Sequence, residues 1–318
     1  MQLIISTTRW LLGLGVIIAA FVIFLGSPLF AADIKPLVSV DWLKDNAERQ
    51  DLVILDIRNK IDGGSAESFT RGHIPGSVHS DYLQGGWRTE VDGVIAQAPS
   101  GAQLEALIGN LGIDNDTTVV VVPAGINASD FGSAARVYWT FKYAGHDTVA
   151  ILDGGYRAWT ADPSNPIETG PSAPLATIFE ANLRPEMRVD GATVHAALDD
   201  GETMLLDGRP AEQFTGKAKH NAAKAAGHIP GAVHFDQAQT FDATSGKLLD
   251  LAKLKGLLPE GLTEAEEVVS YCNTGHWAAV NWFVLSEVAG LSTIKLYDGS
   301  MVEWTQTATR PVAQSPNS

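Results

Sequence analysis

The stretch Gly72-His73-Ile74-Pro75-Gly76, followed by Val78-His79, occurs again in the second half of the chain as Gly227-His228-Ile229-Pro230-Gly231, followed by Val233-His234. Two further signals accompany each copy in the same order. They are Asp56-Ile57-Arg58 and Asp207-Gly208-Arg209 upstream, and Asp153-Gly154 and Asp298-Gly299 downstream. Three signals in one order predict a duplicated domain rather than a short repeat unit.

Each half of the chain alternates short apolar runs with helical stretches. The runs predicted as strands are 52–55, 118–122 and 149–152 in the first half, and 204–206, 267–271 and 294–297 in the second. The predicted helices are 132–143 and 278–288. Near-continuous apolar strands alternating with helices favour a mostly parallel sheet with helices on both faces. The predicted fold class is therefore α/β, with two such domains in tandem.

Prolines, serines and glycine between residues 162 and 174 have the composition of an exposed linker. We therefore place the first domain at 36–161 and the linker at 162–177. The second domain follows at 178–310, and residues 311–318 form a tail.

Residues 1–32 contain one charged side chain, Arg9, which is followed by an apolar run. The segment ends with the two small residues Ala31-Ala32. This order predicts a secretory signal and a periplasmic or secreted protein. The alternative is a retained anchor in the inner membrane, because residues 10–32 are long enough to cross a bilayer. In that case the chain associates with the membrane at its N-terminus.

The charge balance is acidic, with 22 Lys and Arg against 37 Asp and Glu and a net charge of -15. This argues against binding to nucleic acid or to an anionic membrane surface through a broad basic face. Any anionic ligand must therefore be held by a local site. Lys217, Lys219, His220 and Lys224 form a basic stretch that either attracts such a ligand or is a solvated loop.

Cys272 is the only cysteine, so the chain has no intramolecular disulfide. A lone cysteine is often a small buried apolar residue. Here it follows the predicted strand 267–271 and precedes a predicted helix, which places it at a carboxyl strand end, where α/β sheets bind ligands. Free N–H groups at the helix start favour the thiolate, and Gly275 lets the loop curl so that these groups point inward.

With these motifs, the chain after residue 32 resembles the two-domain rhodaneses, the thiosulfate and 3-mercaptopyruvate sulfurtransferases. The resemblance implies an inactive first domain, a catalytic second domain and a site near their interface. The first half has Pro123-Ala124-Gly125 where the second has Cys272, so it lacks a nucleophile. Its expected role is structural, covering the catalytic domain.

The resemblance also implies the chemistry. The Cys272 thiolate takes sulfur from a small anionic donor, becomes a persulfide and passes the sulfur to cyanide or a thiol, which predicts ping-pong kinetics. No metal or organic cofactor is required. Asn273 and Thr274 are neutral where thiosulfate enzymes commonly carry basic residues, and Thr274-Gly275 matches only part of the mercaptopyruvate loop. Asn273 is more similar to the loop of small exported thiosulfate sulfurtransferases, so thiosulfate is the preferred donor and 3-mercaptopyruvate the alternative.

The other expected substrate-binding residues are Arg209 and the loop residues Asn273, Thr274, Gly275, His276 and Trp277. Arg209 either grips the donor's sulfonate or carboxylate or forms an ion pair with Asp207 or Glu212. His276 either assists the leaving group and supports the thiolate with its positive charge, or faces solvent. Trp277 either walls the pocket or packs.

Other classes of function are disfavoured. The histidine pairs of the repeated motif lie one in each domain with no cysteine to complete a tetrahedral set, so we expect turn-stabilising histidines and no metal. A cysteine phosphatase needs an arginine about six residues after its nucleophile, and Ala278 stands there. The alternative from another class is a relay or binding module that accepts persulfide sulfur from a partner protein.

Overall fold

The computed structural model describes residues 34–314. The predicted leader and the last four residues of the predicted tail lie outside the described residues. Among residues 34–314, no helix combines the length and the apolar character that a membrane crossing requires.

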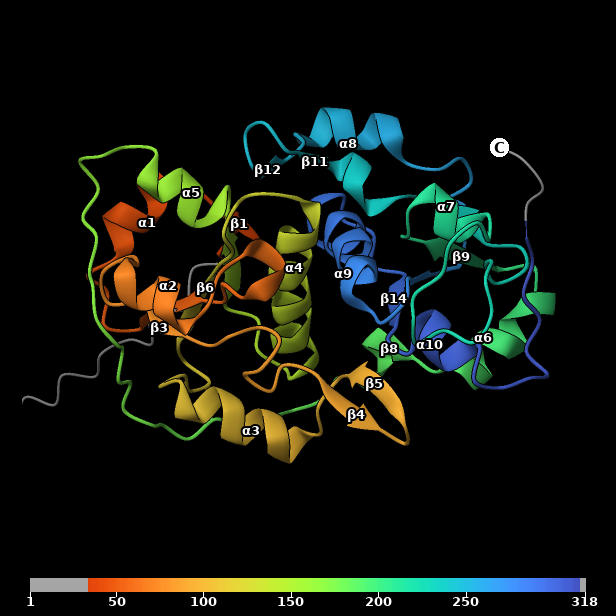
Figure 1. Cartoon of the computed structure of the whole chain (residues 1–318), viewed down its shortest axis with the longest axis horizontal. Coiled ribbons are helices and arrows are strands. Elements are labelled where there is room, and N and C mark those ends of the chain that lie inside the picture. The colour runs from red at the N-terminus through yellow and green to blue at the C-terminus, as the bar shows by residue number, and fades with distance from the viewer. Residues whose placement is uncertain (1–33, 315–318) are drawn as a thin grey trace, which may run out of the picture. The chain divides into compact units, whose positions relative to one another are not determined.

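Two five-stranded sheets, all of whose strand pairs are parallel, form the centres of two domains (Figure 1). The first sheet has the order β1 (Leu37–Val38), β7 (Val149–Leu152), β6 (Thr118–Val122), β2 (Leu52–Asp56), β3 (Val78–His79). The second has the order β8 (Arg188–Val189), β14 (Ile294–Tyr297), β13 (Glu267–Tyr271), β9 (Thr203–Asp207), β10 (Val233–His234). The two orders are equivalent strand by strand, which confirms the predicted pair of α/β domains.

Helices and one small antiparallel hairpin complete each domain. The first domain contains α1 (Val40–Asn46), η1 (Lys60–Asp62), α2 (Ala66–Arg71), the hairpin β4 (Thr89–Val91) and β5 (Val94–Gln97), α3 (Gly101–Asn110), α4 (Ala128–Tyr143) and α5 (Gly155–Thr160). The second contains η2 (Pro185–Met187), α6 (Gly191–Ala196), η3 (Ala197–Asp199), α7 (Ala211–Phe214), η4 (Gln237–Thr240), the hairpin β11 (Phe241–Asp242) and β12 (Lys247–Leu248), α8 (Leu251–Leu257), α9 (His276–Phe283), the π-helical turn η5 (Val284–Val288) and α10 (Ser300–Trp304).

The helix that follows each central strand begins earlier than predicted. Helix α4 starts at Ala128 because the Asn127 side chain accepts a hydrogen bond from the Asp130 N–H and so caps the helix. Helix α9 starts at His276, directly after Gly275, and continues into η5 at Val284. The Cys272 loop is therefore shorter than the sequence indicated.

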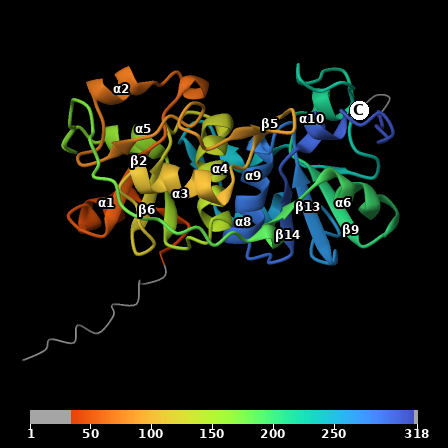
Figure 2. The same ribbon diagram turned by 90° about the horizontal axis from the view of Figure 1, so that it is seen from below.

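Helices α4 and α9 lie side by side between the two sheets (Figure 1, Figure 2). Gly132 permits their close approach, because a Cβ atom there would lie 2.9 Å from the Nε2 atom of His276. Phe283 packs against Phe131 and Tyr138, with ring centroids 5.7 and 4.9 Å away. One continuous apolar core includes residues of both domains, so the domains are packed firmly together.

Each hairpin reaches from its own domain onto the other. The Ala98 N–H, next to β5, donates to the Asp298 Oδ2 atom at 2.6 Å. In return, Arg157 of the first domain donates to the carbonyls of Ala243 and Thr244, between β11 and β12, at 3.4 and 2.9 Å. The loops at the carboxyl ends of both sheets are thus covered by the opposite domain.

The segment between α5 and η2 contains no helix or strand. It follows the first domain, since the Thr177 N–H donates to the Gly109 carbonyl and the Asn182 N–H to the Ala144 carbonyl, both at 2.9 Å. Leu175 and Ile178 are exposed. The boundary placed after residue 177 remains a prediction.

Candidate active site

The two Asp-x-Arg segments build the same buried ion pair in both domains. The Nη2 atom of Arg209 lies 2.6 Å from Asp207 and donates to the Gly227 carbonyl at 2.7 Å. Arg58 lies 2.7 Å from Asp56 and donates to the Gly72 carbonyl at 2.8 Å. Because the domain without a thiol has the same arrangement, the geometry favours the ion-pair alternative for Arg209 over a grip on the donor.

The four histidines of the repeated motif bind the backbone. The Nδ1 atoms of His73 and His228 lie 2.9 and 2.7 Å from the carbonyls of Phe69 and Phe214. Each histidine ring also stacks on the ring of the same phenylalanine. The Nε2 atoms of His79 and His234 lie 2.9 and 2.7 Å from the carbonyls of Arg58 and Arg209. The four histidines therefore stabilise turns of the backbone in both domains. Across residues 34–314, no group of three or more His, Cys, Asp or Glu side chains is placed to hold a metal ion.

Cys272 follows β13 directly and is 1% exposed. Its N–H and that of Gly275 donate to the Ser300 Oγ atom, at 3.0 and 3.2 Å. The carbonyls of Cys272 and Asn273 accept from the first turn of α10, so the loop is fixed on both sides. Ser300 was not among the predicted residues.

The loop after Cys272 and the first turn of α9 retain five N–H groups without a hydrogen-bond partner in the part of the chain described, those of Asn273, Thr274, His276, Trp277 and Ala278. Such groups at a helix start form a concavity that favours an anion. Gly275 has φ of 72°, the conformation that the predicted curl of the loop requires. The loop can therefore stabilise a sulfur anion.

His276 is buried and both of its ring nitrogens are engaged. Nε2 lies 2.9 Å from the Ser129 carbonyl, which can only accept, so Nε2 carries the hydrogen. Nδ1 then accepts from the Tyr82 hydroxyl at 2.9 Å. Burial, with the charges of Arg88 and Arg136, lowers the pKa of His276 to about 3. The expectation that His276 faces solvent is wrong, because the ring is buried, and its lowered pKa leaves no positive charge near neutral pH to support the thiolate. Assistance to the leaving group remains a prediction.

The remaining loop residues make structural contacts. The Trp277 Nε1 atom donates to the Ser129 hydroxyl of the first domain at 2.7 Å, which favours packing across the interface. The Asn273 side-chain amide donates to Gln213 at 2.7 Å. Thr274 is half-buried. A direct role of these residues in binding the donor remains a prediction.

The first domain contributes polar groups to this site that the sequence did not indicate. The Tyr82 hydroxyl is buried, and burial raises the pKa of Tyr82. The charges of Arg88 and Arg136 act in the opposite direction, whereas those of Cys272 and Asp298 raise it further. These four groups therefore lie close enough to influence the Tyr82 hydroxyl. The first domain supplies part of the site rather than only a cover.

The corresponding loop of the first domain already holds an acidic side chain. After β6, the N–H groups of Ala124, Gly125 and Ile126 donate to the carboxylate of Asp130 at 3.0, 2.6 and 2.9 Å. The N–H groups of a loop at this place in the fold can thus bind the oxygens of a carboxyl group. In the second domain the loop after Cys272 has unpartnered N–H groups instead.

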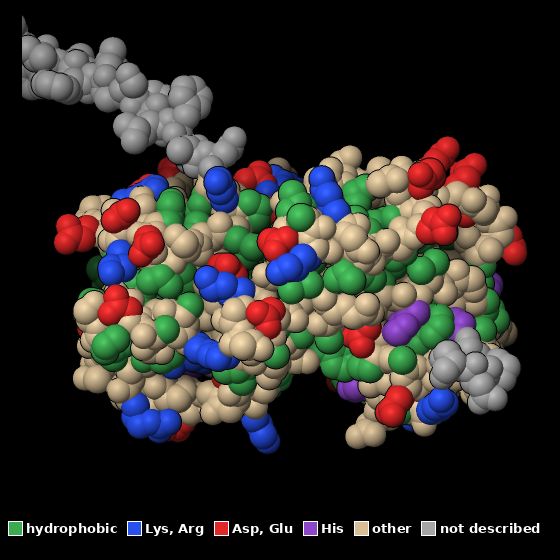
Figure 3. Space-filling view, turned by 90° about the horizontal axis from the view of Figure 1, so that it is seen from above, with side chains coloured by type: hydrophobic (Ala, Val, Ile, Leu, Met, Phe, Trp, Pro, Cys, Tyr) green, Lys and Arg blue, Asp and Glu red, His purple; other side chains and the backbone are tan. Residues whose placement is uncertain are grey.

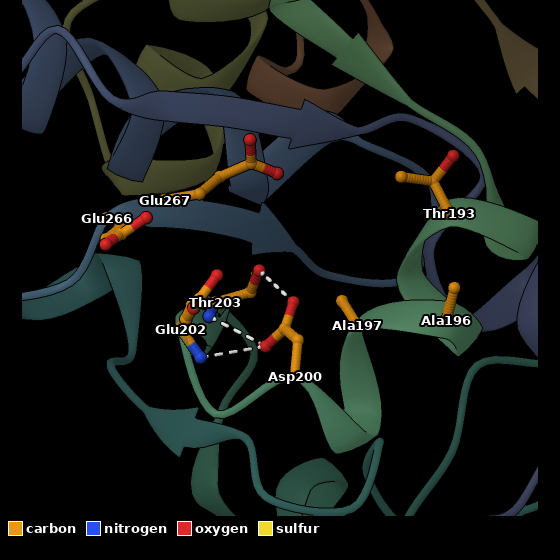
Figure 4. A pocket seen from close by; sticks show the side chains of 8 residues that line it. All are labelled: Thr193, Ala196, Ala197, Asp200, Glu202, Thr203, Glu266 and Glu267. Atoms are coloured by element: carbon orange, nitrogen blue, oxygen red, sulfur yellow. Dashed lines mark hydrogen bonds between the residues drawn. The ribbon is translucent and has the colours of Figure 1, made fainter.

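An acidic cavity lies at the opposite edge of the second sheet (Figure 4). It has a volume of about 440 Å³ and is lined by Asp200, Glu202, Glu266 and Glu267 among others, where β9 and β13 begin. Asp200 accepts hydrogen bonds from Glu202 and Thr203, so its carboxylate is already used.

On the face drawn in Figure 3, basic and acidic side chains are interspersed rather than gathered.

Fold and site together define a duplicated α/β protein with one cysteine loop. The model of the rhodanese-like domain matches residues 39–162 and 191–307, and the chain belongs to the rhodanese family.

Named relatives support sulfur transfer. The chain is 31% identical over 290 residues to the sulfur carrier protein TtuD of Thermus thermophilus, and 31% identical over 286 residues to a putative thiosulfate sulfurtransferase of Mycobacterium bovis. Both alignments cover 87% of this chain and 96% of the relative. SseA of Escherichia coli, titled a 3-mercaptopyruvate sulfotransferase, is 25% identical with a TM-score of 0.73, over 84% of this chain and 99% of SseA.

Proposed function

We propose that the protein moves sulfur from thiosulfate to cyanide or a thiol through a persulfide on Cys272. The observation that carries the proposal is the position of the only cysteine, directly after the central strand β13 and before a loop and helix start with five unpartnered N–H groups. These dipoles are fixed before the reaction and favour the negative sulfur at each stage.

The reaction consists of two displacements. In the first, the Cys272 thiolate attacks the outer sulfur of thiosulfate, the sulfur–sulfur bond of the donor breaks, and sulfite leaves with the electron pair. In the second, cyanide attacks the outer sulfur of the persulfide, and the Cys272 thiolate leaves with thiocyanate as the product. No electrons are gained or lost overall, so the cycle needs no redox cofactor.

The names of the relatives bear on the choice of donor. Several relatives carry the name putative thiosulfate sulfurtransferase, whereas SseA is titled a 3-mercaptopyruvate enzyme. The neutral pair Asn273-Thr274 departs from both patterns. Because several relatives carry the thiosulfate name, we propose thiosulfate as the first donor and 3-mercaptopyruvate as the second.

The alternative is a sulfur relay that takes its sulfur from a partner protein. Two observations favour it, namely the relative named as a sulfur carrier and the 1% exposure of Cys272. A relay needs persulfide uptake but little turnover with small donors.

Steady-state assays of the full chain distinguish the two. Thiosulfate with cyanide, and 3-mercaptopyruvate with a thiol, are the two substrate pairs. Turnover that shows ping-pong kinetics and is abolished in Cys272→Ser supports the enzyme. Arg157→Met is the matched control, because it removes inter-domain contacts at the other hairpin and should leave turnover unchanged. No turnover with either pair, together with persulfide uptake from a partner protein, supports the relay. Turnover that persists in Cys272→Ser contradicts both.

A further inference from the structure

Arg136 connects the first domain to the loop of Cys272. Its side chain, on α4, is fully buried, and Nη2 lies 2.5 Å from the Asp298 Oδ1 atom. Nη1 lies against Gly275, where a Cβ atom would come within 2.2 Å of it. The guanidinium thus touches both the cysteine loop and the carboxylate beside it.

The charges around Asp298 do not balance. Arg188 also faces this carboxylate, with its Nε atom 3.4 Å from Oδ2, so two positive charges meet one negative charge. The Nε and Nη1 atoms of Arg136 have no hydrogen-bond partner among the described residues. A buried charge without a counter-charge is unfavourable.

Within residues 34–314, the other ionisable groups considered beside the loop do not supply the missing negative charge. Arg88 lies over the Tyr82 ring, 4.5 Å from its centroid, and adds a further positive charge. Asp207 is already paired with Arg209. His276 and the Tyr82 hydroxyl are neutral at neutral pH.

We propose that Arg136 is a positioning residue whose charge is balanced by the sulfur anion on Cys272, as thiolate or as persulfide. It holds Gly275 and Asp298 in place, and it makes the first domain a part of the active site. The first domain uses the same principle, since the carboxylate of Asp130 fills its own loop. The inference that Arg136 balances a persulfide rests on the proposed function, whereas the inference that it balances the thiolate does not.

The fraction of Cys272 in the thiolate form tests this directly. With a single cysteine, the ultraviolet absorbance of the thiolate can be titrated in the full chain, with Cys272→Ser as the blank. Arg136→Gln keeps an amide donor for Asp298 and removes the charge. We expect its titration midpoint to rise by about one pH unit or more, as for loss of a nearby opposite charge. Arg136→Lys should restore most of the shift, and Arg157→Met should show none.

Asp298→Asn gives an independent measurement of opposite sign. It removes the negative charge beside the loop, so we expect the midpoint to fall. A merely structural role would move the midpoint in the same direction in both variants, which would overturn the inference. An unchanged midpoint in folded Arg136→Gln would overturn it as well. If Arg136→Gln does not fold, a midpoint that rises in Asp298→Asn is sufficient to reject the proposal.

Failure of the proposed function would look different. If no donor loads sulfur onto Cys272 but the midpoints shift as expected, the charge balance stands and the sulfur-transfer proposal falls. If sulfur is loaded but Arg136→Gln titrates as the unmodified protein does, only the inference about Arg136 falls.

Discussion

Ser300 stands in the second domain where Gly155 stands in the first. Each follows an Asp-Gly pair after equivalent strands, and φ is 50° at Ser300 and 58° at Gly155. A serine in this conformation is strained, whereas a glycine is not. In the first domain a Cβ atom at residue 155 would lie 2.3 Å from the Pro123 carbonyl, so no side chain fits. The second domain therefore accepts strain to place a hydroxyl under the Cys272 loop.

Substitutions of Ser300 should separate the hydroxyl from the strain. Ser300→Ala leaves two buried N–H groups without an acceptor and should destabilise the protein by about 1–3 kcal/mol. Ser300→Gly loses the same hydrogen bonds but relieves strain of about 1 kcal/mol, so it should be the more stable variant. Both should turn over at least about tenfold more slowly. Denaturant unfolding and steady-state assays measure this; full activity in Ser300→Ala would contradict the role of the hydroxyl.

A matched pair of arginine substitutions tests the alternatives for Arg209. Arg209→Lys and Arg58→Lys each keep a charge beside the buried aspartate but lose the fork geometry. If both arginines only hold their turns, the two variants should lose similar stability and neither should change the KM for the donor. A KM that rises in Arg209→Lys alone would show instead that this residue grips the donor.

His276 should make stability depend on pH. Its pKa in the folded protein is about 3, below the ordinary value of 6.5, so between these values the unfolded chain binds more protons. The stabilisation is complete above pH 6.5 and is lost as the pH falls toward 3, by up to roughly 1.4 kcal/mol per unit.

His276→Gln should lack this component of the pH dependence, which denaturant unfolding at several pH values measures. Asp62, whose pKa burial raises to about 6, contributes the opposite slope and is present in both proteins, so the difference between the two curves isolates His276. Parallel curves for the two proteins would show that His276 titrates normally.

Two glycine substitutions test the contact between α4 and α9. Gly132→Ala places a methyl group 2.9 Å from a histidine ring that two hydrogen bonds hold in place, and should destabilise the protein by about 1–3 kcal/mol. Gly256→Ala, in α8, meets nothing within 4 Å and should stabilise by about 0.5–1 kcal/mol. Thermal unfolding of both variants measures this, and equal effects would contradict the close packing.

The sequence predicted the architecture because its signals are local. The strands 118–122, 149–152, 267–271 and 294–297 have the predicted bounds, since a continuous apolar run between turns leaves few alternatives. The duplication is visible as repeated letters. The strand-to-helix position of Cys272 follows from the order of these elements.

The composition of the site could not be predicted in the same way. Arg136 and Tyr82 lie far from Cys272 in the chain, and only the packing of α4 on α9 brings them to the loop. The same packing buries His276, which explains why a positive charge expected from its loop position is absent. Ser300 had a visible signal, the serine that replaces a glycine in the second Asp-Gly copy.

The mass of the intact protein after incubation with thiosulfate tests the central claim most directly. We expect one added sulfur atom on the full chain, none on Cys272→Ser, and removal of the added sulfur by cyanide. Failure of both thiosulfate and 3-mercaptopyruvate to add sulfur, or an equal addition to Cys272→Ser, would contradict the account.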